Sequence, residues 1–286
     1  MATLSVALAT YNEEKNLHRC LASIKDIASE IIIVDGTSID RTVEIAKSFG
    51  AKVQITENHP IFHINKQRAM DLCKSDWILQ LDADEEVSKS LAKEIKEIIA
   101  MKPEEVEKYQ EKLQNRALFL RHQSLLESRD GQIGEKTGEY IAFFFPRKNY
   151  FLGRYLVYGG VYPDGVIRLF KKGKAFLPAK DVHEQMVVKG RVGWLQSDLL
   201  HYDSPTFGKY LIRWRRYTKL IAQDLQKEHR KTDIMLGINY LLVKPVYWFL
   251  LTYIRHKGFL DSWQGFVFSF FSSLRFAKAY LTFLSL

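Results

Sequence analysis

The chain has 286 residues, 47% of them hydrophobic and 26% charged, which is enough to bury a large core in one domain with or without an appendage. Its two cysteines, Cys20 and Cys73, exclude a disulfide framework and favour a reducing compartment. The opening residues, MATLSVALATYNEE, contain neither a basic leader nor a long apolar run. We therefore expect no signal peptide and a catalytic part that stays in the cytoplasm.

The net charge of +9 is distributed unevenly along the chain. Residues 1–139 carry 19 Lys and Arg against 24 Asp and Glu, whereas residues 140–199 carry 10 against 4 and residues 200–286 carry 13 against 5. In the C-terminal part these basic residues alternate with Trp, Phe, Tyr and Leu. This pattern fits an anionic membrane surface better than nucleic acid, so we expect no nucleic-acid partner.

Strands and helices alternate four times in the first ninety residues. The second predicted strand, Glu30–Asp35, has no polar alternation, as in strands that helices cover on both faces. Asp40 is predicted to cap the next helix and Gly50 to end it. The alternation predicts a doubly wound α/β domain with a mostly parallel sheet, whose ligands bind beyond the carboxyl ends of the strands. The predicted strands are 4–9, 30–35, 51–56 and 77–81, and the predicted helices contain Leu17, Leu21 and Ile24, then 41–49 and 64–74.

An acidic run follows the fourth predicted strand, Trp77–Leu81, without a gap. On an extended backbone residues i and i+2 point the same way, so Asp82 and Asp84 can face one divalent cation, Mg²⁺ or Mn²⁺. Such a cation keeps open positions for the phosphate oxygens of a nucleotide. The alternative interpretation is a solvated acidic turn ahead of a helix that begins near Ser88.

Other side chains at the same predicted edge suit a nucleotide. Tyr11 can stack on a base, and Glu13 or Asp35 can accept hydrogen bonds from a pyrimidine ring or a ribose. Arg68, on the third helix, can reach a phosphate. Each residue also has an ordinary alternative role, in packing, in a helix turn or as a solvated charge. Because they converge, we predict a nucleotide-sugar site made of Thr10, Tyr11, Glu13, Asp35, Ser38, Arg68, Asp82 and Ala83.

Three sequence motifs follow one another at characteristic distances: A-T-Y-N-E-E (9–14), V-D-G-T-S-I-D-R-T (34–42) and L-D-A-D-E (81–85). They resemble the family 2 glycosyltransferases of GT-A fold, and within them the bacterial inner-core lipopolysaccharide β-glucosyltransferases. Further similar phrases are R-K-N-Y-F-L-G-R (147–154), G-G-V-Y-P-D (159–164), R-L-F (168–170), V-H-E (182–184) and G-F-L-D (258–261). The resemblance implies a nucleotide-sugar donor, a metal at Asp82 and Asp84, and an inverting transfer. Pro is common in the family where Ala9 stands and Trp where Val161 stands, which affects the expected base pocket and acceptor platform.

The middle of the chain is expected to form the acceptor side. Residues 102–138 look like an insertion that starts with a charged helix at 103–114 and ends in a glycine-rich loop. A strand is predicted at 140–145 and another at 166–170, within the loop-rich segment 147–180. Inverting transfer needs a carboxylate that takes the proton of the attacking hydroxyl, and Glu184 is the candidate base. Candidates for acceptor binding, with loop packing as the alternative, are Tyr158, Tyr162, Asp164, Arg168 and His183.

The C-terminal residues 205–286 are predicted to form helices at a membrane. Apolar residues from Phe207 to Leu225 recur every three or four positions with basic residues between them, as in a basic amphipathic helix. Residues 236–254 are apolar except for Asn239 and Lys244, and Pro245 is expected to break or kink the helix. We favour helices that lie in the interface over true spans, with a buried core pair or dimer interface as a further alternative. Arg213 and Arg216 can close over a diphosphate or face the membrane.

These predictions combine into one hypothesis and two rivals. Residues 1–204 would form a GT-A domain, with a donor half at 1–101, the insertion and an acceptor half at 139–204. The chain would be a metal-dependent glycosyltransferase that moves a sugar, a hexose such as glucose, from a UDP-type donor to a glycolipid or lipid-linked acceptor at the cytoplasmic membrane face. One rival is a polyprenyl-phosphate glycosyltransferase of the same fold. The other is a non-catalytic membrane adaptor that binds nucleotide.

Overall fold

The computed structural model describes residues 2–178, 185–228 and 232–285. The chain divides into two compact units, one of residues 1–147 and 163–201 and the other of residues 148–162 and 202–286. The assignment of residues 148–162 to the second unit is not evident from the sequence, because their partners there lie about a hundred residues further along the chain.

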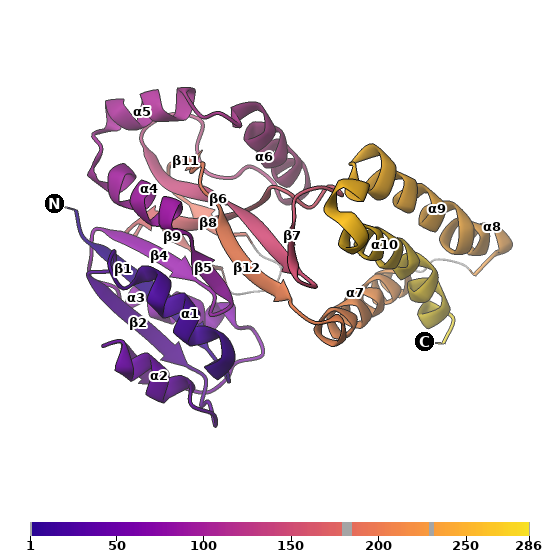
Figure 1. Cartoon of the computed structure of the whole chain (residues 1–286), viewed down its shortest axis with the longest axis horizontal. Coiled ribbons are helices and arrows are strands. Elements are labelled where there is room, and N and C mark those ends of the chain that lie inside the picture. The colour runs from indigo at the N-terminus through magenta and orange to yellow at the C-terminus, as the bar shows by residue number, and fades with distance from the viewer. Residues whose placement is uncertain (1, 179–184, 229–231, 286) are drawn as a thin grey trace. The chain divides into compact units, whose positions relative to one another are not determined.

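The first unit begins with the predicted alternation (Figure 1). Its elements are β1 (Leu4–Thr10), α1 (Glu14–Ile24), β2 (Glu30–Asp35), α2 (Thr42–Ser48), β3 (Lys52–Ile55), α3 (His63–Asp71) and β4 (Trp77–Leu81). The four strands are parallel and lie in the order β3-β2-β1-β4. Gly50 has a φ of 72° just after α2, as expected of a helix-ending glycine. The carboxyl ends of these strands therefore meet at one edge of the sheet.

Beyond β4 the sheet becomes antiparallel. Strand β8 (Asp164–Lys171) pairs with β4, β6 (Tyr140–Phe151) pairs with β8, and β12 (Leu199–Ser204) pairs with β5 (Glu85–Val87). The full order is β3-β2-β1-β4-β8-β6-β12-β5, with β7 (Arg154–Leu156) and β11 (Arg191–Trp194) paired to β6. A small second sheet joins β9 (Ala175–Phe176) to β10 (Val187–Val188). The sheet is mixed, because strands from the second half of the chain extend the parallel strands of the first.

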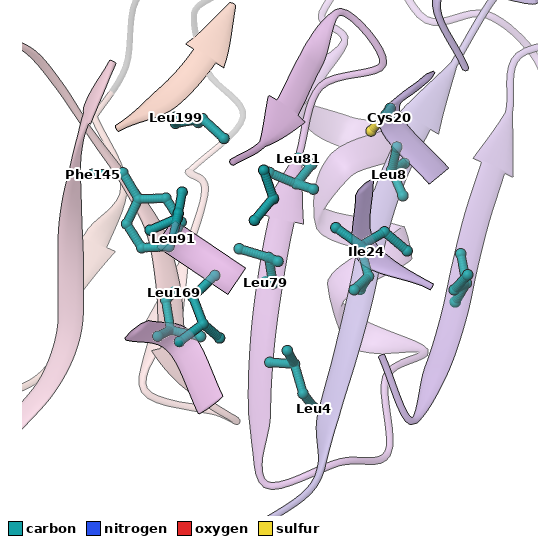
Figure 2. Close-up of a cluster of buried hydrophobic side chains, with 14 of the residues drawn as sticks. Leu4, Leu8, Cys20, Ile24, Leu79, Leu81, Leu91, Phe145, Leu169 and Leu199 are labelled. Carbon is teal, nitrogen blue, oxygen red and sulfur yellow. The ribbon is translucent and has the colours of Figure 1, made fainter. Parts of the chain in front are cut away.

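Two apolar cores lie on the two faces of this sheet. Alternate residues of β4 point to opposite faces, so Leu79 and Leu81 belong to one core and Ile78 to the other. Figure 2 shows Cys20 and Ile24 of α1 in the first core together with Leu79, Leu81 and Leu91, the last from α4 (Lys89–Ala100). Ala69 and Met70 of α3 lie in the other core, so helices cover both faces of the parallel strands, as predicted. Both cysteines are buried and free.

The predicted insertion contains two helices where the sequence indicated one. The first, α5 (Pro103–Glu111), was expected; the second, α6 (Arg116–Asp130), was not, because its apolar residues do not repeat along one face. Phe119 is the buried residue of α6, and its ring stacks on that of Trp194 with 4.7 Å between centroids. The insertion is thus packed on the sheet through this aromatic pair and through the two hydrogen bonds of the Gln110 side chain with the backbone of Trp194, rather than through a helical stripe on α6.

The second unit is built mainly from three long helical segments. The predicted amphipathic helix is α7 (Phe207–Lys227), and the last is α10 (Ser262–Phe283), preceded by a short 3₁₀ turn at Gly258–Asp261. Between them lies a helix from Ile234 to Arg255, made of α8 (Ile234–Ile238), a π-helical turn (Asn239–Val243), α9 (Lys244–Phe249) and a second π-helical turn (Leu250–Arg255).

Pro245 does not end this helix, so of the two predicted outcomes, a break or a kink, the break does not occur. Pro245 lies in the first turn of α9, directly after a π-helical turn, where its missing N–H donor is tolerated. In the described part of the chain, Ile234–Arg255 is the helix that is long and apolar enough to cross a membrane by length and composition, and only 17% of its most apolar window is buried.

Candidate functional site

Asp35 ties together the loops that follow β1 and β2. Its buried carboxylate accepts hydrogen bonds from Thr10 Oγ1 (2.8 Å), Ser38 N (2.8 Å) and Ser38 Oγ (2.7 Å). Ser38 Oγ also accepts from the backbone N–H of Asn12 (2.8 Å). A carboxylate has about four acceptor positions, so about one remains for a ligand. The structure therefore brings Thr10, Asp35 and Ser38 together at the predicted strand edge.

The other predicted donor-side residues surround this edge. Tyr11 is 46% exposed, which leaves its ring accessible for stacking. Arg68 Nη1 donates to Thr56 Oγ1 (2.7 Å), and the backbone N–H of Thr56 donates to the carbonyl oxygen of Asp35 (2.8 Å). Glu13 Oε2 accepts from Asn16 Nδ2 (2.8 Å), an interaction within the first helical turn. Of these residues, Tyr11 is the most accessible to a base.

The acidic run after β4 forms a turn, so the expectation of an extended backbone there was wrong. Strand β4 ends at Leu81 and β5 begins at Glu85, and the N–H of Glu85 donates to the carbonyl oxygen of Asp82 (2.9 Å). Ala83, between the two aspartates, is buried. The chain reverses here because β5 pairs with β12 instead of continuing beside β1. Asp82 and Asp84 consequently contact different partners.

Asp82 is held by two cations. Its Oδ1 forms an ion pair with Lys66 Nζ, and its Oδ2 lies 2.7 Å from Arg168 Nη2. Burial by itself would raise the pKa of Asp82, but the charges of Lys66 and Arg168 outweigh burial and hold this pKa well below its usual range. Asp82 is therefore ionised at neutral pH.

Asp84 faces a histidine that the sequence did not single out. Its Oδ2 lies 3.6 Å from Nε2 of His201 on β12, and His201 is 8% exposed. A carboxylate and an imidazole so close together suit a divalent transition metal or Mg²⁺ with additional ligand oxygens. Within the described residues, no group of three His, Cys, Asp or Glu side chains is placed to hold a metal. A metal here would need further ligands from the donor or from water.

A buried network of charges continues from Asp82. Glu85 is fully buried, and its Oε1 accepts from Arg168 Nη2 (2.7 Å) and Arg147 Nη1 (3.2 Å). Arg147 also donates to Asp164 Oδ2 through Nη2 (2.6 Å). Burial would lower the pKa of Arg147, but Asp164 and Glu85 outweigh it and raise this pKa. The network joins the predicted residues Asp82, Asp164 and Arg168.

Sequence reasoning missed four members of this site: Lys66, Gln80, Glu85 and Arg147. Arg147 lies in a phrase shared with the family, and Glu85 lies in the acidic run, so their presence was visible but their burial was not. In the sequence, Lys66 looks like an ordinary charged residue of a helix. Gln80 accepts from Arg168 Nη1 (2.5 Å) inside a strand that reads as apolar. No sequence signal distinguishes these last two.

A cavity of about 280 Å³ lies beside the network. The side chains of Lys66, Arg147 and Arg168 line it together with Asp82, and its other walls are partly apolar and partly polar. Three cations around one small cavity suit an anionic ligand. The full lining is Phe62, His63, Lys66, Gln80, Asp82, Arg147, Val166, Ile167, Arg168, Leu177, Gln185 and Met186.

The remaining predicted residues that the structure describes belong to the second unit. Tyr158 and Tyr162 belong to the second unit, where Tyr158 is 38% exposed and Lys148 Nζ lies 5.7 Å from the ring centroid of Tyr162. Arg213 and Arg216 belong to it as well: Arg213 forms an ion pair with Asp203, and Arg216 is exposed. The candidate base Glu184 and the acceptor candidate His183 lie outside the described residues.

Known proteins resemble this chain over different lengths. Residues 5–110 match Glycosyl transferase family 2. An uncharacterized glycosyltransferase of Rickettsia typhi is 28% identical over 97% of this chain and 87% of its own length. The lipopolysaccharide core biosynthesis glycosyltransferase LpsC of Rhizobium meliloti is 25% identical over 95% of this chain and 91% of its own. Among solved structures, glucosyl-3-phosphoglycerate synthase from Mycobacterium tuberculosis, in complex with Mn²⁺, UDP and glucosyl-3-phosphoglycerate, is 25% identical over 29% of this chain and 34% of its own, with a TM-score of 0.27.

The parallel strands with an acidic edge, and the relatives that span nearly the whole chain, define a glycosyltransferase. The part of the chain that carries this edge, residues 5–110, is a glycosyl transferase family 2 domain.

Proposed function

We propose that this enzyme moves a hexose from a UDP-type donor to a glycolipid acceptor of the lipopolysaccharide-core type at the cytoplasmic face of a membrane. The observation that carries the proposal is the cavity beside Asp82, where Lys66, Arg147 and Arg168 converge. Three cations next to the acidic strand edge suit the diphosphate of a nucleotide sugar. The exposed ring of Tyr11 supplies a stacking surface for the base.

The residues near Asp84 fit a divalent metal. Asp84 and His201 offer an oxygen and a nitrogen 3.6 Å apart, and both side chains are largely buried. Asp84 and His201 would hold Mg²⁺ or Mn²⁺ together with donor phosphate oxygens, while Asp82, predicted as a second ligand, pairs with Lys66 and Arg168 in this structure. When bound, such a metal neutralises charge on a diphosphate leaving group.

Side chains of the protein would take part in the transfer as a base and as cations beside the leaving group. In an inverting transfer the acceptor hydroxyl oxygen bonds to the anomeric carbon while the bond from that carbon to the diphosphate oxygen breaks, and the diphosphate leaves with the electron pair. The hydroxyl proton passes to a carboxylate, for which Glu184 is the proposed base. Lys66, Arg147 and Arg168 would stabilise the negative charge that grows on the diphosphate.

Two observations support a glycolipid acceptor. The relative LpsC, similar over 95% of this chain, is named for lipopolysaccharide core biosynthesis. The helix Ile234–Arg255 leaves most of its apolar surface uncovered within the protein. An enzyme held at a bilayer meets a lipid-anchored acceptor by diffusion in two dimensions, which suits a peripheral or monotopic location.

The test begins with donor binding. We would measure thermal shifts with UDP-glucose, UDP-galactose, GDP-mannose and ADP-glucose, each with and without Mn²⁺ or Mg²⁺. A ligand at a hundred times its Kd stabilises by about 2.7 kcal/mol. A metal-dependent shift with a UDP-sugar is expected, and the absence of a shift with any of the four would contradict the donor assignment.

The second step separates the rival acceptors. Radiolabelled donor would be incubated with rough lipopolysaccharide truncated at the inner core, or with polyprenyl phosphate. Label in the lipopolysaccharide supports the proposal, and label only in polyprenyl phosphate supports the rival transferase. Donor binding with neither transfer nor hydrolysis would indicate the non-catalytic adaptor. Glu184→Gln sharpens the choice, because transfer to a phosphate needs no general base and would survive this substitution.

A further inference from the structure

In the second unit, residues 152–159 are fastened to residues 256–264 by a series of hydrogen bonds. Leu152 O accepts from Gln264 Nε2 (3.2 Å), Leu260 O accepts from Arg154 Nη2 (3.4 Å), and His256 O accepts from the N–H of Gly159 (2.9 Å). The two segments are therefore in contact along their length. The first carries Tyr158, and the second joins the helix Ile234–Arg255 to α10.

Asp261 is the centre of this contact. It is 1% exposed, and its Oδ2 accepts from two consecutive backbone N–H groups, those of Val157 (3.0 Å) and Tyr158 (2.7 Å). Its Oδ1 lies 3.8 Å from Arg154 Nε and has no hydrogen bond among the described residues. Burying a carboxylate costs free energy unless hydrogen bonds compensate for its lost hydration. Here the N–H groups of Val157 and Tyr158 supply that compensation.

Asp261 does not cap the helix at whose N-terminus it lies. Asp261 occupies the N-cap position of α10, where an aspartate usually accepts from N–H groups of the first helical turn. Here its side chain makes no capping hydrogen bond and accepts from Val157 and Tyr158 instead. The first turn of α10 thus has no side-chain cap from Asp261, whereas two backbone N–H groups of the loop with Tyr158 are held by hydrogen bonds.

The turn that carries Asp261 is itself tightly packed. A Cβ atom on Gly265 would lie 1.9 Å from the carbonyl oxygen of Gly258, so no side chain fits there. Gly159 and Gly160 have φ values of 72° and 78°, the left-handed conformation that glycine adopts most readily. These glycines therefore fix the backbone conformation of both segments in the contact. The ring of Tyr158 remains 38% exposed.

We propose that Asp261 is a positioning residue for the acceptor: it fixes the backbone of Val157 and Tyr158 so that the exposed ring of Tyr158 is presented to the sugar of a membrane-anchored glycolipid. This rests on the proposed function. The N–H of Gly159 donates to the carbonyl oxygen of His256, the residue directly after the apolar helix ends at Arg255, so the loop with Tyr158 meets the end of the helix that we assign to the bilayer. An aromatic face held in place binds a sugar ring without the entropy cost of ordering a loop.

The experiment compares Asp261→Ala, Asp261→Asn and a matched control in the full-length protein with vesicles of anionic phospholipid. Asp233→Ala is the control, because Asp233 also accepts a backbone N–H in this unit, that of Leu236 (2.6 Å), but caps its own helix. Amide hydrogen exchange at Val157 and Tyr158 should accelerate about tenfold or more in Asp261→Ala and remain slow in the control. Asp261→Asn retains an acceptor oxygen and should restore most of the protection.

Kinetics provide the second readout, with inner-core-truncated rough lipopolysaccharide and polyprenyl phosphate as acceptor probes. Asp261→Ala should raise the KM for the acceptor about tenfold and leave the Kd of UDP-glucose unchanged, because a displaced loop loses orientation toward the acceptor alone. If Asp261 acts through Tyr158, adding Asp261→Ala to Tyr158→Ala should raise KM no further. Additive effects, an unchanged KM, or equal effects of the control would overturn the proposal.

The outcomes also separate this proposal from the proposed function. If the wild type labels neither acceptor probe, the proposed function fails, and the exchange of the Val157 and Tyr158 amides still decides whether Asp261 holds the loop. Retained protection in Asp261→Ala would then overturn the positioning role. If the wild type labels the lipopolysaccharide and Asp261→Ala does so with the same KM, the proposed function stands and the positioning role is wrong.

Discussion

The two units of this protein depart in opposite ways from the usual distribution of side chains: the first buries charged groups, and the second exposes apolar ones. In the first, Glu85 and Arg168 are buried and hydrogen-bonded to each other, and Asp82 pairs with buried Lys66. In the second, Leu242 and Val246 are 61% and 58% exposed on the helix Ile234–Arg255. Soluble proteins usually do the reverse, with charges outside and leucines inside.

Neither the buried charges of the first unit nor the exposed apolar helix of the second is explained by the stability of the fold alone. Burying an ion-pair network contributes little net stability, because desolvation offsets much of the attraction. A preorganised set of charges is useful, however, when a ligand with a growing negative charge enters. An exposed apolar helix face is equally unfavourable in water, and a bilayer surface removes that cost. Under the proposed function, the buried charges serve the donor diphosphate and the exposed apolar helix serves the bilayer.

The largest effect should come from removing one charge at the centre of the buried network. Glu85→Gln keeps the shape of the side chain but leaves Arg147 and Arg168 short of a counter-charge, a loss of about 3 to 5 kcal/mol in the free energy of unfolding. Urea denaturation would measure it. The matched control is Glu44→Gln, which removes an exposed ion pair with Arg41 and should leave the midpoint where it was. Equal midpoints for both variants would show that the network is not tightly coupled.

The next effect concerns catalysis rather than stability. Asp84→Ala should fold normally and lose about a hundredfold or more in transfer rate, because a donor diphosphate would lack its counter-cation. Mn²⁺-dependent thermal shifts with UDP-glucose should vanish in the same variant. Asp71→Ala, an exposed acid on α3, serves as the control. Full activity of the wild type in EDTA would remove the metal from the mechanism.

A smaller effect tests the apolar side of the comparison. Val246→Asp places a charge in the exposed apolar stretch and should weaken binding to anionic vesicles by about 2 kcal/mol or more, roughly thirtyfold. Flotation with vesicles measures the partition. Ile39→Asp, at a 92% exposed residue of the first unit, should bind as the wild type does. The membrane assignment would be wrong if the wild-type protein stayed monomeric and soluble without lipid or detergent.

Salt and alkali distinguish interfacial helices from spanning ones. Attraction of Lys and Arg to anionic headgroups contributes roughly 1 kcal/mol for each residue near the surface and weakens with salt. If the helices lie in the interface, high salt or alkaline carbonate should release part of the protein. If Ile234–Arg255 spans the bilayer, only detergent should release it.

The parallel half of the sheet could be predicted because its signals are local. Unbroken apolar strands such as Glu30–Asp35 and helix-ending residues such as Gly50 need no distant partner to be recognised. The second half depends on pairings that no local pattern reveals. His201 meets Asp84 only because β12 pairs with β5, and residues 148–162 join the second unit only through contacts such as those with Asp261.

The site was predictable to a similar extent. Asp35, Asp82 and Asp84 could be singled out because acids at or just after the ends of buried strands stand out from the sequence, and their roles stay predictions. Lys66 and Gln80 were not, because a helix lysine and a strand glutamine are ordinary until the fold buries them beside Arg168 and Asp82. The backbone reversal at 82–84 was missed for the same reason, since the strand that causes it lies more than a hundred residues away.

The last prediction concerns Glu30, at the opposite end of β2 from Asp35, and shows whether a charge away from the site matters only for folding. Glu30 accepts hydrogen bonds from Ser5 Oγ (2.6 Å) and Lys74 N (2.6 Å) and pairs with Lys52 Nζ (3.0 Å). Burial would raise the pKa of Glu30, but these contacts outweigh it and lower the pKa from 4.5 to about 2. Because the folded-state pKa is the lower one, Glu30 stabilises the protein fully above about pH 4.5, and this contribution disappears as the pH falls toward 2.

Glu30→Gln should therefore be less stable than the wild type at pH 7, and the gap between their urea midpoints should close between pH 4.5 and about 2. Transfer activity at pH 7 should be unchanged, because Glu30 lies at the amino end of its strand while the site lies at the carboxyl end. A gap that stays constant with pH would mean that the stabilisation comes from the shape of the side chain and not from its charge. A loss of activity in the folded variant would show that the charged groups of the first unit act on the site as one connected system.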